Sequence, residues 1–90
     1  MRPGLSGSRL RVDVRAALLD LGVHPLDATS RERVREFVND LYTLELRRLR
    51  ARLRRGDFPK REYAGRVEAL RRRRYWMLSL PIDQWSDPAA

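Results

Sequence analysis

Hydrophobic residues recur along most of this chain at spacings of three and four, which is the pattern of an amphipathic helix. The first stripe predicts a helix over residues 9–21 and consists of Leu10, Val14, Ala17, Leu18 and Leu21. Ser8 precedes it as a candidate N-cap, and Gly22 follows it where a left-handed residue commonly ends a helix. The alternation in "RLRVDVR" is also typical of a strand, so a strand over residues 9–15 stays an alternative.

A second, longer stripe predicts a helix over residues 30–55, which contain neither Gly nor Pro. Thr29, followed three residues later by Glu32, is a capping-box motif at its start. The stripe turns by about a quarter of the helix circumference partway along, so we expect a different neighbour for each half. The first half carries Val34, Phe37, Val38 and Leu41, and the second half carries Tyr42, Leu46, Leu49 and Leu53.

The residues "GDFP" at 56–59 favour a tight reversal into a third helix over residues 59–78. Its apolar positions repeat at the same heptad-like spacing, which is what an antiparallel helical hairpin requires. The expected seam pairs are Leu53 with Tyr63, Leu49 with Val67, Leu46 with Leu70, and Tyr42 with Arg74, with Met77 continuing the stripe. The sequence therefore predicts an all-α fold of three helices, dominated by a long antiparallel hairpin.

The whole chain, residues 1–90, is expected to form a single small helical domain. Residues 1–7 would be a flexible lead, and residues 79–90 a non-helical tail that begins near Pro81. Because Trp85 is too apolar to be left in water, this tail should either dock on the first half of the second helix or bind a partner.

The net charge of +8 and the pI of about 11.3 indicate that the partner is anionic. The whole excess lies between Arg47 and Arg74, where thirteen basic residues face three acidic ones. Lys60 is the only lysine among the twenty basic residues, and arginine favours bidentate contacts with phosphate. A GC-rich coding sequence would produce the same bias, so a compositional origin is the competing interpretation.

The basic segment supplies the candidate nucleic-acid contacts. Within it, "RRRRYW" combines four arginines with aromatic rings that could stack on unpaired bases, worth roughly 1–3 kcal/mol each. The alternative is that Tyr75 and Trp76 belong to the core and that the arginines are solvated. The candidate contact residues are Arg47, Arg50, Arg54, Arg55, Lys60, Arg61, Arg66, Arg71, Arg72, Arg73 and Tyr75.

Glu45, Arg48 and Arg52 interrupt the apolar face of the second helix. We expect Glu45 to form an ion-pair cluster with Arg48 or Arg52 across the hairpin, which Arg74 could join. Such a cluster would fix the helix register more than it stabilises the fold. A polar seam that contacts another subunit is the alternative.

The sequence contains few residues of the types that usually catalyse reactions. Cysteine is absent, His24 is the only histidine, and no glycine-rich nucleotide loop is present. We therefore expect no enzyme activity, no catalytic residues, no metal and no cofactor. No run of about 18 apolar residues exists, so no membrane contact is expected, and the lack of cysteine suits the cytoplasm.

The segment from Leu46 to Arg73 resembles the SHOCT family of short helical modules. The matching elements are Leu46, Leu49 and Leu53, then Gly56 with Phe58, then Glu62, Tyr63 and Leu70. The resemblance covers about a third of the chain, and this segment is richer in arginine than the family. It implies association or oligomerisation, with no catalytic residues.

Two classes of function follow. The first is a basic module that contacts nucleic acid or a ribonucleoprotein through its arginines. The second is a protein-interaction or oligomerisation module, with an acidic protein or a second copy in a homodimer as the partner. Its contact residues would be Tyr42, Leu46, Leu49, Leu53, Tyr63, Val67, Leu70 and Trp85.

Overall fold

The fold is all-α, as predicted, in a computed structural model that describes residues 10–24 and 29–86. Its helices are α1 (Val12–Asp20), α2 (Arg31–Arg54) and α3 (Tyr63–Arg74). The 3-10 turn η2 (Lys60–Glu62) precedes α3, and η3 (Trp76–Ser79) and η4 (Ile82–Trp85) follow it. The predicted lead at residues 1–7, the Ser8 cap and residues 87–90 of the tail lie outside the described residues.

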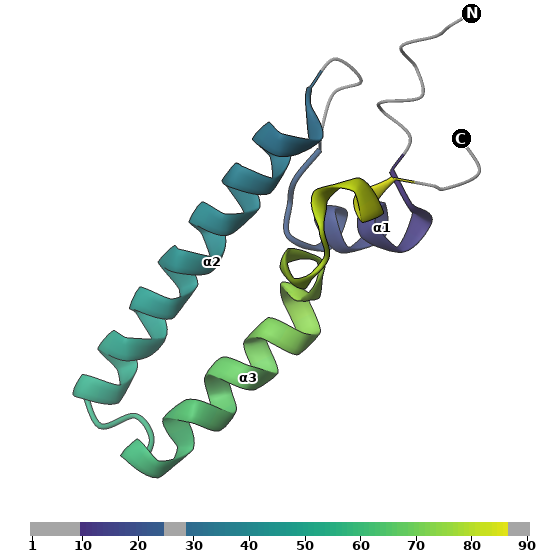
Figure 1. Ribbon diagram of the computed structural model, residues 1–90. Helices are drawn as coiled ribbons and strands as arrows, with labels where there is room; N and C mark the ends of the chain where they lie inside the picture. The colour runs from purple at the N-terminus through teal and green to yellow at the C-terminus, as the bar shows by residue number, and fades with distance from the viewer. Residues whose placement is uncertain (1–9, 25–28, 87–90) are drawn as a thin grey trace, which may run out of the picture.

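The long hairpin of α2 and α3 projects from the rest of the molecule (Figure 1). Gly56 ends α2 with a φ of +82°, and its amide and that of Asp57 donate to the carbonyls of Leu53 and Arg52 at 3.0 Å. These two bonds are a Schellman motif, which satisfies carbonyls that the helix leaves free. The prediction of a reversal at Gly56 is confirmed.

A ring contact defines the register of the two helices at the end near the core. The Tyr42 and Tyr75 ring centroids lie 5.0 Å apart, where the spacing predicted Tyr42 beside Arg74. The register is therefore displaced by one residue at this end. Leu49 is buried, and the other seam residues Leu46, Leu53, Tyr63, Val67 and Leu70 are half-buried. Half-burial is what a layer of only two helices produces, because one side of the seam stays open.

The main core lies at the other end of α2, where η3 and η4 of the tail contact its first half and α1 contributes to the same cluster of buried residues (Figure 1). This arrangement gives α2 a different neighbour along each half, as its turning stripe predicted. The buried core residues are Val14, Leu18, Val23, Val34, Val38, Tyr75, Met77 and Trp85.

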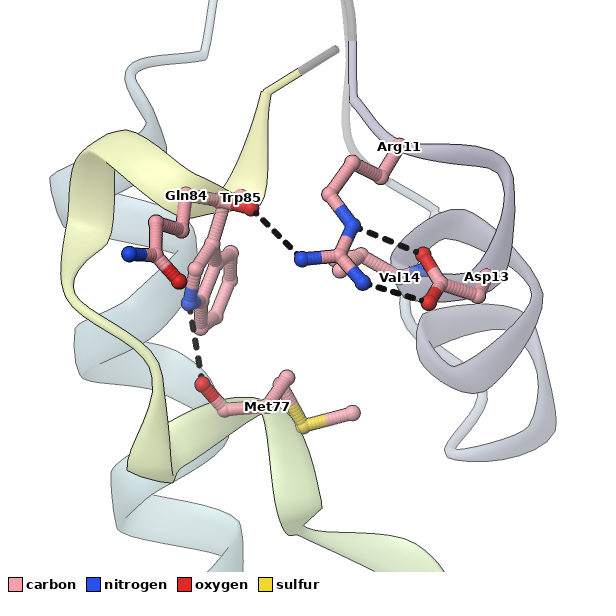
Figure 2. A network of polar contacts seen from close by, with 6 residues as sticks. All are labelled: Arg11, Asp13, Val14, Met77, Gln84 and Trp85. Atoms are coloured by element: carbon pink, nitrogen blue, oxygen red, sulfur yellow. Dashed lines mark hydrogen bonds and ion pairs between the residues drawn. The ribbon is translucent and has the colours of Figure 1, made fainter. Parts of the chain in front are cut away.

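The tail closes this core through Trp85, whose side chain has no exposed surface. Its indole Nε1 donates to the Met77 carbonyl at 3.0 Å, so the buried donor is satisfied (Figure 2). Arg11 donates to the Gln84 carbonyl at 3.2 Å, while its guanidinium also holds the Asp13 carboxylate (Figure 2). Docking of the tail on the first half of α2 is confirmed as far as Ser86.

Several predicted boundaries are wrong. The Thr29–Glu32 capping box does not form, because Ser30 is the N-cap and its hydroxyl accepts from the Arg33 amide at 3.1 Å. The third helix ends at Arg74 instead of residue 78, and the tail is not free of helix, since it continues in η3 and η4. The described part of this segment, residues 10–15, is neither all helix nor all strand: Leu10 pairs with Ser86 in an isolated bridge, and α1 starts at Val12.

The molecule is elongated, with a radius of gyration of 15.7 Å and a longest dimension of 56 Å. A compact domain of this length would have a radius of gyration of about 12 Å. The hairpin accounts for the difference, because its distal half extends beyond the core and exposes both flanks. No helix within residues 10–24 and 29–86 is long and apolar enough to cross a membrane.

Candidate nucleic-acid interface

A groove of about 520 Å³ runs between α2 and α3 along one face of the hairpin. Its walls carry five arginines and one glutamate, and its floor is apolar. The groove therefore has an excess of four positive charges. We call this feature the arginine groove; its lining residues are Glu45, Arg48, Leu49, Arg52, Arg66, Ala69, Leu70, Arg73 and Arg74. Low-dielectric walls beside charges of one sign concentrate the field in a groove and attract anions.

The carboxylate in the arginine groove is already neutralised. Glu45 Oε2 lies 3.4 Å from the Arg74 guanidinium, and it accepts a hydrogen bond from the Tyr75 hydroxyl. The predicted ion-pair cluster across the hairpin therefore exists between Glu45 and Arg74, whereas Arg48 and Arg52 do not pair with Glu45. Because the glutamate charge is compensated, it does little to repel an incoming anion.

Arg48 and Arg73 are the available cations of the groove. One comes from α2 and the other from α3, both are exposed, and neither has an ion-pair partner among the residues that the structure describes. An anion in the groove would meet guanidinium groups from both helices, each able to form bidentate hydrogen bonds with a phosphate.

Phe58 packs against two of the groove arginines. Its buried ring lies 4.2 Å from the Arg66 guanidinium carbon and 5.6 Å from that of Arg52, which are cation–π distances. Arg66 also contacts Glu62 at 3.1 Å, and Arg52 lies 3.6 Å from Asp57. These contacts hold two of the five arginines in fixed positions.

Two aspartates outside the groove are also tied to arginine. A hydrogen bond from Arg55 holds the pKa of Asp57 below its ordinary value, although partial desolvation opposes the shift. The guanidinium of Arg11 lowers the pKa of Asp13 in the same way at the start of α1. Both carboxylates thus stay ionised and positioned at the two ends of the molecule.

The predicted contact residues do not form one surface. Arg66 and Arg73 line the arginine groove, whereas Arg47, Arg50 and Arg54 are exposed on other sides of α2. Of the exposed basic residues between the end of α2 and the end of α3, some contact another side chain and others do not. Arg55 pairs with Asp57, Arg72 lies 3.9 Å from Glu68, Arg71 reaches Ser79, and Lys60 and Arg61 have no ion-pair partner in the described chain.

Both aromatic predictions need correction. Tyr75 is 1% exposed and belongs to the core, so it cannot stack on a base. Trp76 is half-buried and packs against the same core. Trp85 is fully buried, which removes it from the set of partner contacts. The alternative interpretation of "RRRRYW", with its aromatics in the core, is the correct one.

Arg48, Arg52 and Arg74 line the groove but were not among the predicted nucleic-acid contacts. The available signal was their position beside the leucines of the seam, which places them at the helix–helix boundary. That position was interpreted as an ion-pair cluster, with a polar seam to another subunit as the alternative, and not as a nucleic-acid contact. Arg73 and Arg74 also line a second hollow beside α1, where Asp13 and Asp20 contribute opposing charge.

The chain matches no protein-family model, no curated protein and no solved structure.

Proposed function

We propose that this protein is a non-enzymatic, cytoplasmic helical module that binds nucleic acid, alone or in a ribonucleoprotein, through the arginine groove. The observation that carries the proposal is the groove itself, in which five arginines from two helices surround one neutralised glutamate. Contacts of this kind would be made to phosphates, so they would provide affinity and position with little sequence specificity.

Four of the groove arginines form two pairs with different expected roles. Arg52 and Arg66 are held by Phe58 and nearby carboxylates, so they would supply a fixed positive field at the distal end. Arg48 and Arg73 have no such partners and would make the direct contacts with phosphate. The apolar floor at Leu49 and Leu70 would accept the less polar face of a sugar or base.

Fluorescence anisotropy with labelled duplex DNA, labelled single-stranded RNA and a simple polyanion tests this proposal. The double variant Arg48→Ala, Arg73→Ala should bind nucleic acid about tenfold more weakly or worse than the wild type, a loss of roughly 1.4 kcal/mol or more. The matched control Arg15→Ala, Arg33→Ala removes the same charge from exposed positions outside the groove and should have a smaller effect. Equal affinities of the two double variants would contradict the proposal.

A protein-interaction module without a nucleic-acid role is the second candidate. Phe37 and Leu44 support it, because they are 53% and 40% exposed on α2. Association is also what the resemblance to SHOCT modules implies. Weak binding that is equal for all three polyanions at physiological salt would favour this candidate.

A further inference from the structure

No described element lies against the side of α2 that faces away from α3 (Figure 1). By helical spacing, this outer side carries an apolar stripe. Phe37, Leu44 and Ala51 form this outer stripe at seven-residue intervals, and all three are exposed. Heptad spacing keeps the three side chains along one line for about 21 Å of helix, the geometry of a coiled-coil contact.

Charges beside the outer stripe are separated along the helix. We call Glu32, Glu36, Asp40, Arg47, Arg50 and Arg54 the outer ridge. These six residues are acidic in the first half of α2 and basic in the second half, and none of them has an ion-pair partner among the described residues. Arg33, which is also exposed beside the outer stripe, is a basic residue within the otherwise acidic half. Like charges three or four residues apart repel one another along a helix, so the ridge lacks the compensation that alternating signs would give.

The positions of these charges are symmetric about residues 43 and 44. Glu36 and Arg50 lie seven residues to either side of Thr43, and Asp40 and Arg47 lie three and four residues away. Turning a second copy of α2 end over end about this point would bring Glu36 opposite Arg50 and Asp40 opposite Arg47 of the second copy. Leu44 would then meet Leu44 of the second copy.

We propose that the outer side of α2 forms a twofold-symmetric homodimer in which two copies of α2 pack antiparallel, centred at Thr43 and Leu44. Such an interface is self-complementary in net charge, because the half that is acidic overall meets the basic half, and Arg33 is the residue that would face a like charge, Arg54 of the second copy. A parallel pair would place like charges together, and an acidic partner would be repelled by Glu36 and Asp40. This proposal does not rest on the arginine groove, which lies between α2 and α3 and would stay open in the dimer.

Charge reversal gives the sharpest test. The variant Glu36→Arg, Asp40→Arg makes the outer ridge mostly basic, and the variant Arg47→Glu, Arg54→Glu makes it mostly acidic. Light scattering after gel filtration, over a hundredfold range of concentration, should find the wild type dimeric and each variant alone monomeric. An equimolar mixture should form a heterodimer, although the two variants carry net charges of +12 and +4 and repel overall.

A monomeric wild type at every concentration would overturn the proposal. So would a dimeric wild type whose two variants stay monomeric when mixed, provided that circular dichroism finds each of them helical.

A single cysteine provides a second readout, because the chain has none. Leu44→Cys lies at the proposed twofold axis, where residue 44 meets its own copy, and should form an intermolecular disulfide under mild oxidation. Glu68→Cys, on the exposed side of α3, is the matched control and should form at least tenfold less. Equal cross-linking of the two variants would contradict the proposed centre of the dimer.

Discussion

Tyr75 has its hydroxyl group between α2 and the end of α3, where it donates a hydrogen bond to Glu45. Burial and the neighbouring carboxylate both disfavour the tyrosinate form, and together they raise the pKa of Tyr75 to about 12. The nearby Arg74 opposes the shift without reversing it. The neutral phenol is therefore part of what holds the hairpin to the core.

Because the pKa of Tyr75 is raised in the folded protein, the stability of the fold should decrease at alkaline pH. The stabilisation from neutral Tyr75 is complete below pH 10, the unfolded value, and is lost as pH rises through about 12. A shift of this size corresponds to about 2–3 kcal/mol of unfolding free energy at most. Tyr75→Phe should remove most of the stability loss between pH 10 and 12 in denaturant titrations.

Near-ultraviolet absorbance reports the same group directly. The wild type should contain a tyrosine that ionises near pH 12, and this step should disappear in Tyr75→Phe. Tyr63→Phe is the control, since Tyr63 is half-buried and should leave the step in place. If an ionisation near pH 12 persisted in Tyr75→Phe, the raised pKa would not belong to Tyr75.

The misassignment of Tyr75 has a physical cause. On a continuous helix, Tyr75 would lie about 140° around the axis from Leu70 and would point away from the seam. The backbone leaves the α conformation at Tyr75, with φ −122° and ψ 23°, and this turns the ring inward. Sequence periodicity cannot predict such a turn, because it assumes that the helix continues.

At the scale of elements, α1 and α2 end in the same way. Gly22 and Gly56 both adopt φ +82°, and each is followed by an amide that donates to a carbonyl one turn back. Val23 buries its side chain beside Leu18 after the first of these turns, which adds the apolar contact typical of a Schellman motif. Both ends were predictable, because glycine tolerates this backbone conformation better than other residues.

Two glycine substitutions should act in opposite directions. Gly56→Ala should destabilise the protein by about 1–2 kcal/mol, because alanine is strained at positive φ even though its methyl group meets no neighbour. Gly65 lies inside α3 with open space around it, so Gly65→Ala should stabilise by about 0.5–1 kcal/mol. Chemical denaturation of both variants measures these changes, and a stabilised Gly56→Ala would show that the turn is not strained.

The hairpin was more predictable than the start of α2. Seam spacing over several heptads restricts which residues can meet, and the register came within one residue at Tyr42. At the start of α2, Thr29 and Ser30 are both good caps, and the choice between them depends on where the chain arrives from the core. No local pattern contains that information, and Ser30 is the residue used.

At the scale of the whole molecule, the chain separates a core at one end from a charged hairpin at the other (Figure 1). The uneven charge along the sequence predicted that the hairpin would be the basic part. It did not predict which arginines converge, because that depends on the rotation of α2 against α3. Arg48 and Arg73 lie twenty-five residues apart in the chain and line one groove.

The salt dependence of RNA binding tests the central claim most directly. Each phosphate contact with a single strand contributes about −0.7 to the slope of log affinity against log salt concentration. The slope for Arg48→Ala, Arg73→Ala should therefore be shallower than that of the wild type by about 1.4. The Arg15→Ala, Arg33→Ala control should keep the wild-type slope. If the groove variant keeps the wild-type slope as well, these two arginines do not contact phosphate and the arginine groove is not the binding site.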